Sequence, residues 1–300
     1  MPVPHSAALD TPQGTAGPND PVLVGAGDIS SCENDGDEKT ARILDQVLAT
    51  ATAETVVFAA GDNVYENGTL EEYEQCFGPT WGRHKDRIRP ALGNHEYGAE
   101  GAANGYFAYF GEVAGDPGKG YYSFDLGTWH VVVLNTSDHC GIVRCEEGSE
   151  QELWLRADLE SHPTFCTLAI QQDPRFSSSA RKGGRAQSIP FWQTLHEYGA
   201  ELVISGDEHN YERFSPQTPF GGLDPEHGIR QFVVGTGDNG LDTFEEAAIP
   251  NSEIRGDSNY GVISLTLHPA SYDWEFIPED GGQFRDAGNG ACHGAPTAPS

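Results

Sequence analysis

The chain has 300 residues, of which 37% are hydrophobic, and this is enough to bury the core of one large domain. Lys and Arg number 17 against 46 Asp and Glu, which gives a formal net charge of −29. Such a negative field repels nucleic acid and anionic membranes, and no stretch reaches the roughly 18 apolar residues of a membrane-spanning helix. We therefore expect an acidic globular protein without nucleic-acid or membrane partners, and the sequence leaves its oligomeric state open.

Residues 1–20 are rich in Pro, Gly, Ala and Thr, and they lack the basic start and apolar core of a signal peptide. We interpret them as a flexible N-terminal arm of the kind that remains when an export signal has been removed. The remaining residues, 21–300, contain no long linker and no repeat of fixed period. We therefore expect a single domain there.

The six cysteines form an even set without a Cys-x-x-Cys pair, which favours disulfides and an oxidising compartment. Cys140 and Cys145 are close enough in the chain for a local bridge, and a bridge between Cys32 and Cys76 would join two loops. The sequence does not fix the pairing. We expect a secreted or extracytoplasmic protein.

The first elements predict a strand-helix-strand unit. Residues 21–24 and 55–60 are short apolar runs typical of buried strands. A helix beginning near Asp37 is expected between them, because apolar residues recur on one of its faces. A right-handed crossover then brings Asp28 and Asp62, which follow the two strands, to the same edge of a sheet.

The rest of the chain predicts a second unit of this kind and a β-rich tail. Strands are expected over residues 130–134, 165–170 and 201–205, and over 231–234, 260–267 and 272–277 in the tail. One helix is expected to follow Ser149, in a capping box with Glu152, and another to run from Ser188 to near Gly199. The tail is expected to form a further antiparallel sheet, and the order of elements predicts an α/β fold.

Five segments that follow apolar runs end in metal-binding side chains: Gly27-Asp28, Gly61-Asp62-Asn63-Val64-Tyr65, Gly93-Asn94-His95-Glu96, Gln172-Asp173-Pro174-Arg175 and Gly206-Asp207-Glu208-His209. Each alone is more often a turn or a packing residue. Five in chain order favour a bimetallic hydrolytic centre, in which an Asp bridges two cations about 3.5–4 Å apart. We expect these segments to meet at one edge of one sheet.

These ordered motifs resemble those of the calcineurin-like metallophosphoesterases, and Tyr65, three residues after Asp62, points to the purple acid phosphatase branch. The resemblance implies a four-layer α/β/β/α sandwich of two mixed sheets that hydrolyses a small anionic phosphate ester. It also implies that a first metal (Fe, Mn or Zn) is held by Asp28, Asp62, Tyr65 and His209. Asp62 would bridge to a second metal, of which Asn94 would be a ligand.

For the reaction, the resemblance implies that a metal-bound hydroxide attacks phosphorus while His95 assists the leaving oxygen. Arg175 is interpreted as a cation near the phosphate, whereas Arg213 is expected to form a structural ion pair. Arg181, Lys182 and Arg185 form the densest positive patch and are candidates for docking an anionic substrate.

Two departures from the family pattern concern the second metal. The chain has Gln172 and Asp207 where family members usually carry imidazoles. Their oxygens would complete an all-oxygen second site suited to Mn, Mg or Ca. The added carboxylate predicts weaker attraction for a phosphomonoester dianion. Two alternatives stay open: a degenerate relative that binds metal or ligand without phosphatase activity, and a different reaction on the same fold.

Two loops complete the expectations. Residues 235–240 predict a glycine-rich turn, because they lack the Lys-Ser/Thr ending and the following helix of a phosphate-binding loop. Residues 177–179 are interpreted as a mobile loop at the mouth of the site, because no base and acid lie nearby in a nucleophile pattern.

Overall fold

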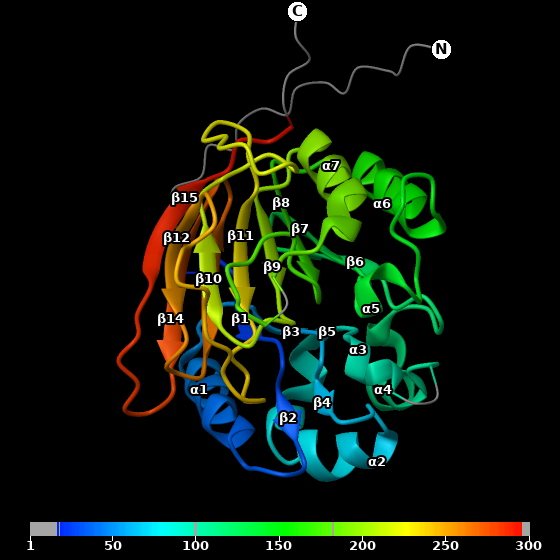
Figure 1. The fold of residues 1–300 in the computed structure, drawn as a ribbon, viewed down its shortest axis with the longest axis vertical. Helices are drawn as coiled ribbons and strands as arrows, with labels where there is room; N and C mark the ends of the chain where they lie inside the picture. Colours follow the sequence, from blue (N-terminus) through cyan, green and yellow to red (C-terminus); the bar gives the residue numbers. More distant parts are fainter. Residues whose placement is uncertain (1–16, 18, 99–100, 182, 296–300) are drawn as a thin grey trace, which may run out of the picture.

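The computed structural model describes residues 17, 19–98, 101–181 and 183–295, which form a sandwich of two mixed β-sheets. Helices cover the outer faces of both sheets, so the layers follow the order α/β/β/α (Figure 1). This confirms the four-layer fold that the motifs imply. The arm predicted over residues 1–20 lies outside the described residues, except for residues 17, 19 and 20.

The first sheet has six strands and contains the predicted strand-helix-strand unit. In sheet order, its strands are β15 (Ala287–Ala291), β14 (Ser271–Pro278), β13 (Gly261–His268), β1 (Val22–Ala26), β3 (Thr55–Ala60) and β5 (Ile88–Ala91). Strand β3 runs parallel to β1 and β5, while β13 is antiparallel to β1. Helix α1 (Asp37–Thr50) connects β1 to β3 and buries Ile43 and Leu44. A short parallel pair, β2 (Ser30–Ser31) and β4 (Val64–Tyr65), lies beyond the ends of β1 and β3.

The second sheet has seven strands. In sheet order, they are β12 (Ser252–Gly256), β10 (Tyr211–Phe214), β11 (Arg230–Val234), β9 (Leu202–Ser205), β8 (Cys166–Gln171), β7 (Trp129–Val133) and β6 (Tyr122–Leu126). Strands β7, β8, β9 and β11 are parallel, and the others pair antiparallel to their neighbours. Helices α6 (Glu150–Ser161) and α7 (Ile189–Glu197) pack on its outer face.

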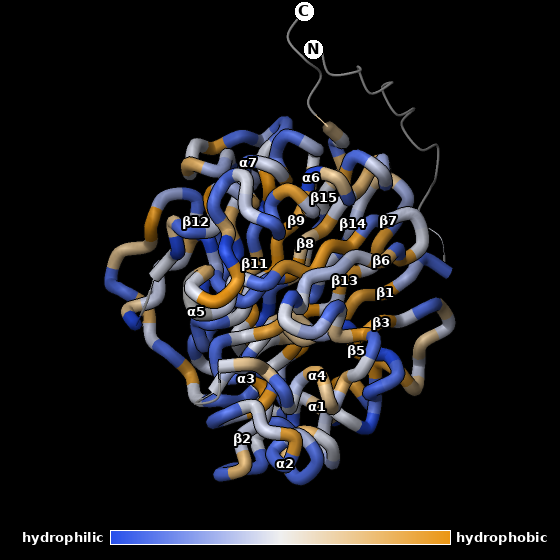
Figure 2. The backbone as a smooth tube through the Cα atoms, turned by 90° about the vertical axis from the view of Figure 1, so that its right-hand side faces the viewer, coloured by the Kyte–Doolittle hydropathy of each residue, from blue (hydrophilic) through white to orange (hydrophobic). Residues whose placement is uncertain are grey.

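Side chains of the central strands alternate between two cores, as the period of two residues requires. Val131 and Val133 of β7 belong to the large cluster between the sheets, whereas Val132 packs under α6 and α7. In β8, Leu168 faces the first core and Ala169 the second. Figure 2 shows the hydrophobic stretches gathered along such central strands. Burying each Val or Leu contributes roughly 1.5–3 kcal/mol, so these strands anchor the fold.

The tail differs from the prediction. The predicted strands over 231–234, 260–267 and 272–277 form, but they do not make a separate antiparallel sheet. Strand β11 instead lies parallel to β9 in the second sheet, while β13 and β14 complete the first sheet beside β1. Alternation marks a strand with one buried face, and it carries no information about which sheet receives the strand.

Helix α6 also differs in one detail. Ser149 is its N-cap and accepts a hydrogen bond from the Glu152 backbone N–H at 3.3 Å, but the reciprocal half of the predicted capping box is missing. The Ser149 N–H instead donates to the Glu146 carbonyl, and Glu152 accepts from Gly148. Leu153, in the first turn of α6, is 56% exposed.

Shorter helical segments lie in the connections between strands. They are α2 (Leu70–Glu72), η1 (Tyr73–Phe77), η2 (Trp81–Arg87), α3 (Asn94–Tyr97), α4 (Asn104–Phe110), η3 (Gly111–Ala114), α5 (Ser137–Cys140) and η4 (Ala186–Ser188). Within the described ranges, every helix is too short or too polar to cross a bilayer.

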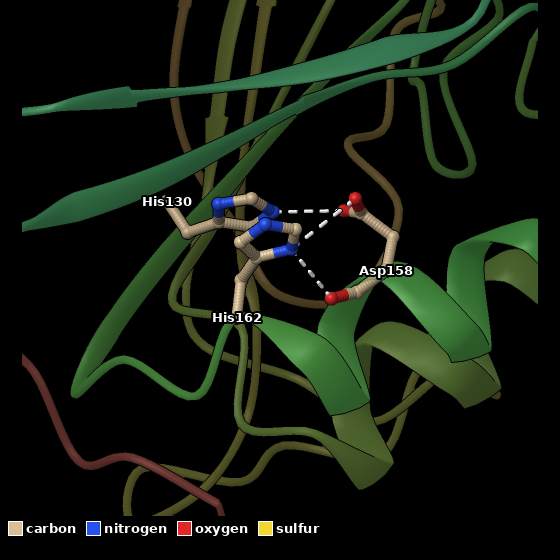
Figure 3. A group of neighbouring side chains, drawn as sticks. All are labelled: His130, Asp158 and His162. Atoms are coloured by element: carbon tan, nitrogen blue, oxygen red, sulfur yellow. Dashed lines mark hydrogen bonds and ion pairs between the residues drawn. The ribbon is translucent and has the colours of Figure 1, made fainter.

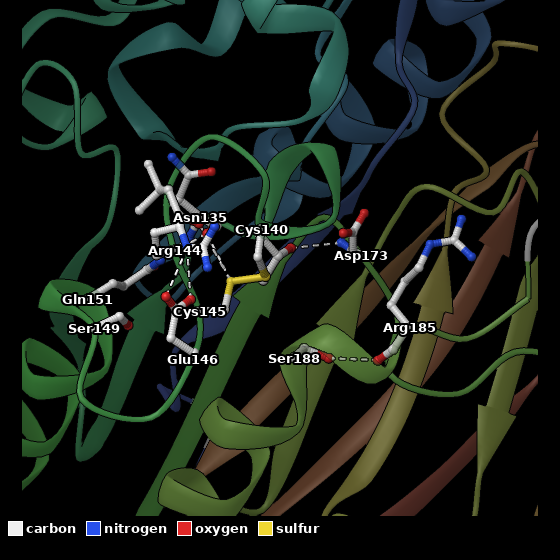
Figure 4. Close-up of a disulfide and its surroundings, with 12 residues drawn as sticks. Asn135, Cys140, Arg144, Cys145, Glu146, Ser149, Gln151, Asp173, Arg185 and Ser188 are labelled. Carbon is white, nitrogen blue, oxygen red and sulfur yellow. Dashed lines mark hydrogen bonds and ion pairs between the residues drawn. A yellow bond between two sulfur atoms is a disulfide. The ribbon is translucent and has the colours of Figure 1, made fainter.

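Three disulfides include all six cysteines. Cys32 bonds to Cys76, 44 residues away, and ties the loop after β2 to η1. Cys140 and Cys145 close a local turn beside the segment that carries Asp173 (Figure 4). The third bridge joins Cys166 of β8 to Cys292, which lies just after β15 and 126 residues further along the chain. It links the two sheets covalently.

Candidate metal centre

The five motif segments meet between the two sheets. Asp28, Asp62 and Asn94 follow β1, β3 and β5 of the six-stranded sheet, while Gln172 and Asp207 follow β8 and β9 of the seven-stranded sheet. The expectation of one edge of one sheet is therefore wrong in this respect. Each set lies at the carboxyl ends of parallel strands, and the sandwich brings these two edges together.

Close backbone packing at glycines permits this approach. A Cβ added to Gly61 would lie 1.9 Å from Gln172 Oε1, across the interface between the sheets. A Cβ on Gly206 would lie 2.7 Å from the Ala60 carbonyl oxygen and 2.8 Å from Asp28 Oδ2. These three distances are shorter than real Cβ contacts, so larger residues at Gly61 or Gly206 would push the two edges apart.

Four side chains converge in the first half of the site. Tyr65 Oη donates to Asp28 Oδ1 at 2.9 Å and lies 3.3 Å from Asp62 Oδ2 and 3.5 Å from His209 Nε2. His209 Nε2 is 3.3 Å from the same Asp28 oxygen. All four side chains are buried, none with more than 5% exposure. Two carboxylates, a phenol and an imidazole thus present oxygen and nitrogen atoms to one point.

Three aspartates at strand ends share an unusual backbone conformation. Asp28, Asp62 and Asp207 have φ of 59°, 45° and 66°, in the left-handed region that few side chains other than Asn and Asp adopt. Such residues persist only where the surroundings hold them, and they cluster at functional sites. All three belong to the predicted motif segments, which supports a functional role for these strand ends.

Glu96 holds the loops after β3 and β5 together. Its buried carboxylate accepts hydrogen bonds from the backbone N–H groups of Asn63 at 2.8 Å, Val64 at 3.3 Å and Gly93 at 2.7 Å. The Tyr73 hydroxyl donates to it as well, at 3.1 Å. Glu96 therefore positions the segments that carry the candidate ligands. The motif pattern alone gave no indication of this supporting role.

The turn over residues 235–240 supports the same site from the other side. The N–H groups of Asp238 and Asn239 donate to the Asp28 carbonyl at 2.9 and 3.2 Å, and Gly237 donates to the Gly27 carbonyl at 2.9 Å. A Cβ on Gly235 would lie 2.7 Å from Asp28 Oδ2. The segment is thus a turn, as predicted, and it fixes the backbone of Asp28.

The electrostatics of the first half fit a bound cation. Burial raises the pKa of Asp62 well above its usual range, and the charges of Asp28 and Glu96 act in the same direction. Burial and both aspartates likewise raise the pKa of Tyr65. Burial lowers the pKa of His209, but the adjacent Asp28 outweighs it and leaves this pKa raised. Positive charge at this point would stabilise the ionised carboxylates and the phenolate.

The second half is organised differently. Gln172 is fully buried, and neither its amide oxygen nor its amide nitrogen has a hydrogen-bond partner among the described residues. The Asp207 carboxylate accepts a hydrogen bond from Arg185 Nη2 at 3.1 Å, and Glu208 Oε1 lies 3.8 Å from the same nitrogen. Asn94 is half-buried at the start of α3.

A second divalent ion does not fit this arrangement as it stands. The Asp207 carboxylate, which would have to be a ligand, already holds a guanidinium group. Arg185 was interpreted from the sequence only as part of a docking patch with Arg181 and Lys182, of which Lys182 lies outside the described residues. Its sequence distance of 22 residues from Asp207 gave no indication of the pair.

His95 lies beside the first half of the site. Its backbone N–H donates to Asp62 Oδ1 at 2.9 Å, and its ring lies over Tyr65 with a centroid separation of 4.3 Å. Nδ1 is 2.8 Å from the Glu66 carbonyl, which can only accept, so Nδ1 carries the hydrogen. The other nitrogen, Nε2, remains available for proton transfer at the partly exposed edge of the ring.

The arginines do not all lie where the sequence suggested. Arg175 donates from Nε to the Pro219 carbonyl at 3.2 Å and stacks near Phe176, and burial lowers its pKa. Arg181 lies closer to the ligands, with Nη1 3.4 Å from the His209 ring nitrogens and 3.2 Å from Asp242. Arg181 is thus a better placed cation than Arg175 in this structure.

Two further expectations have clear outcomes. Arg213 forms the predicted structural ion pair, with Asp286 at 2.7 Å and also with Glu253. The interpretation of residues 177–179 as a mobile loop is wrong, because all three serines are buried. Ser178 is held by Glu212, which accepts from its N–H at 2.7 Å and from its hydroxyl at 2.5 Å.

A separate cluster with metal-binding side chains lies at the C-terminal end of α6. His130 and His162 both face Asp158, and the two rings stack with centroids 4.7 Å apart (Figure 3). His130 Nε2 is 2.8 Å from Asp158 Oδ2, while its Nδ1 is 2.8 Å from Asp125. Hydrogen bonds with these carboxylates raise the pKa of His130, although burial opposes them. The cluster therefore forms an internally paired ion network.

The fold and the first-half geometry define a metallophosphoesterase type of protein. The model of the family described as calcineurin-like phosphoesterase matches residues 22–211, so the chain belongs to this family. Within the family, it lies in the purple acid phosphatase-like branch.

Similar proteins come from plants. Purple acid phosphatase 15 of Arabidopsis thaliana is 27% identical over 250 residues, which cover 73% of this chain and 45% of that protein. "Probable inactive purple acid phosphatase 1" of the same plant is 26% identical over 297 residues, with 87% and 47% covered. The chain spans less than half the length of both relatives. The structure of purple acid phosphatase PPD1 from yellow lupin seeds matches the fold with a TM-score of 0.73 at 19% identity, covering 95% of this chain and 58% of that one.

Proposed function

We propose that this protein is a metal-dependent phosphoesterase whose metal is held by Asp28, Asp62, Tyr65 and His209. The observation that carries the proposal is the convergence of their ligand atoms, with Tyr65 Oη within 3.5 Å of atoms of the other three. Family membership supports the hydrolytic reaction class. The donor set suits Fe, Mn or Zn, because it mixes carboxylate, phenol and imidazole.

A metal held there would act as a Lewis acid on the phosphoryl oxygen and lower the pKa of a water molecule that it binds. The protein groups supply the remaining steps. His95 keeps one hydrogen on Nδ1, and its Nε2, when it is also protonated, can donate that second proton to the leaving oxygen and return to the neutral imidazole. Arg181, exposed beside His209, supplies positive charge for a small anionic phosphate ester. Arg175 would have to leave the Pro219 carbonyl to take the role expected for it.

A second candidate is a metal-binding or ligand-binding protein without phosphatase activity. The pairing of Asp207 with Arg185 favours it, because the all-oxygen second site expected from Asn94, Gln172 and Asp207 would lose one ligand. One plant relative carries the name "Probable inactive purple acid phosphatase 1", and this name agrees with a candidate that lacks activity. The two candidates share the first metal and differ in turnover.

We also propose that the protein acts in an oxidising compartment, as a secreted or extracytoplasmic protein. Its support is the pairing of all six cysteines in three disulfides. The absence of free thiols in the described part of the chain agrees with this proposal.

The test is hydrolysis of p-nitrophenyl phosphate and of bis-p-nitrophenyl phosphate after loading with Fe, Mn, Zn, Mg or Ca in turn. Wild-type protein is expected to turn over one of these esters, and Asp62→Asn is expected to lower kcat/KM by about 100-fold or more. Asp116→Asn, at an exposed acidic position, is the matched control and should keep full activity. Metal binding without turnover of either ester would favour the second candidate.

A further inference from the structure

We propose that the guanidinium group of Arg185 takes the place of the second cation, so that this centre binds a single metal ion. The inference rests on the proposed metal-dependent function of the first half, and it concerns what balances the charge of the second half. Its starting point is the direct pairing of Arg185 with Asp207, where the resemblance implies a ligand of the second metal.

The backbone fixes Arg185 from several sides. Its N–H donates to the Pro174 carbonyl at 2.8 Å, and its own carbonyl accepts from the Ser188 hydroxyl at 3.1 Å. Nη1 donates to the Gly183 carbonyl at 2.6 Å. Figure 4 shows the side chain extending away from the Ser188 end of this segment, on the side of Asp173. These hydrogen bonds hold Arg185 in a defined position, so its guanidinium is not part of a loose surface patch.

The burial of two carboxylates explains why a guanidinium lies in the second half. Asp207 and Glu208 are fully buried, and the Arg185 side chain is only 10% exposed. Buried carboxylates require a compensating positive charge, from a metal ion or from a paired side chain. A divalent ion at Asp207 would have to displace Arg185, which would bring two positive groups into the same low-dielectric space.

The paired Asp207 is coupled directly to the first half. Its backbone N–H donates to Asp28 Oδ2 at 2.9 Å, while Asp28 Oδ1 faces Tyr65 and His209. Asp207 therefore connects Arg185 to a ligand of the proposed metal, through its carboxylate on one side and its backbone N–H on the other. The family pattern predicts a second cation at this position, next to Asp207.

Gln172 adds an independent observation that a ligand belongs here. Its amide is fully buried and has no hydrogen-bond partner in the described part of the chain, although such groups in proteins are nearly always satisfied. Gln172 Oε1 lies 3.2 Å from a Cβ position on Gly206, the residue before Asp207. The Gln172 amide N–H₂ can donate to an oxyanion, and this contact requires no second metal.

The replacement also defines the ligand class. An oxyanion such as a phosphoryl group could bind the single metal and the Gln172 amide, close to the positive charge of Arg185. A guanidinium carries one positive charge where a divalent ion carries two, so attraction for a phosphomonoester dianion is weaker than at a bimetallic centre. An ester with one negative charge suits this balance better.

The test begins with wild-type protein, stripped of metal and titrated with Mn²⁺. Metal analysis after desalting is expected to give about one ion per chain, against about two for a bimetallic centre. Electron paramagnetic resonance is expected to show isolated Mn²⁺, without the exchange coupling of a bridged pair. Two ions per chain with a coupled spectrum would overturn the inference, and this measurement requires no variant.

Variants then separate Arg185 from the missing imidazoles. The double variant Gln172→His with Asp207→His is expected still to bind about one Mn²⁺, because Arg185 remains. Adding Arg185→Met is expected to raise the count to about two and to produce a coupled spectrum. Two Mn²⁺ ions per chain in the double variant would show that Arg185 does not exclude a second ion. Arg144→Met, at an exposed arginine paired with Glu146, is the control in both backgrounds.

Failure of the proposed function is distinguishable from failure of this inference. One ion per chain without hydrolysis of either nitrophenyl ester would remove the phosphoesterase proposal and support the single-cation centre. Active protein with two bridged ions would retain the phosphoesterase proposal and overturn the role of Arg185. Near-ultraviolet circular dichroism on each variant establishes that the count refers to folded protein.

Discussion

The two halves of the site solve the same electrostatic problem in different ways. In the first half, the carboxylates of Asp28 and Asp62 face the Tyr65 hydroxyl, and Asp28 also faces the His209 ring. In the second half, Asp207 is paired with Arg185. Both halves bury acidic groups at the carboxyl ends of parallel strands.

If the second half binds no metal, as we propose, the comparison illustrates how the charge balance of a site can change while the fold stays the same. The backbone features are retained on both sides, since Asp28 and Asp207 both adopt left-handed φ after their strands. What changes is the source of positive charge, which is a side chain on one side and, by our proposal, a metal on the other. Each half can therefore be tested by removing its cation or its ligands.

The largest effect is expected for Arg185→Met in the wild-type background. It leaves the Asp207 carboxylate buried without its guanidinium, and breaking a buried pair in this way costs about 3–5 kcal/mol of unfolding free energy. Urea denaturation at pH 7 measures the loss. Arg144→Met removes an exposed pair with Glu146 and is expected to give no measurable change. Equal stabilities of the two variants would contradict the structural importance of the Arg185 pair.

A loss of metal affinity of about 100-fold, or roughly 2.7 kcal/mol, is expected for His209→Ala, because it removes the imidazole of the first half. Asp207→Asn, in the second half, is expected to weaken the same metal by less than about tenfold. Isothermal titration with Mn²⁺ provides both values. A larger loss for Asp207→Asn would reverse the assignment of the two halves.

A smaller effect is expected for Glu96→Gln, which acts on the first half through its loops. The neutral amide keeps the shape but weakens hydrogen bonds from the backbone N–H groups of Asn63 and Gly93, at a cost of about 1–3 kcal/mol. We expect lower thermal stability together with lower Mn²⁺ affinity, measured by calorimetry. Loss of stability with unchanged affinity would show that the loops keep their positions without the charge.

The smallest effect concerns the His130 cluster, a third region, in which carboxylates and imidazoles pair with each other. Because the folded pKa of His130 is raised, its contribution to stability is fully present below its unfolded value of about 6.5. It is lost as the pH rises through the folded pKa. The stability difference between wild type and Asp158→Asn should therefore shrink from pH 6 to pH 9 in urea titrations. A difference that is constant with pH would show that His130 stays neutral.

The local elements and the candidate ligands of the first half could be predicted from the sequence. Strand β3 and the start of α1 lie where apolar periodicity places them, because burial imposes that period within one segment. Each Gly-Asp after such a strand then marks a candidate ligand, as for Asp28 and Asp62. These features depend only on neighbours along the chain.

Features that depend on contacts between distant segments could be seen only in the folded chain. The tertiary structure divided the five motifs between two sheets, placed β11 beside β9, and joined Cys166 to Cys292 across 126 residues. It also gave Asp207 its partner Arg185. Periodicity reports which face of an element is buried, but the identity of the group that meets this face is fixed by packing. The charge balance of the second half therefore followed from the fold and could not be deduced from the motifs.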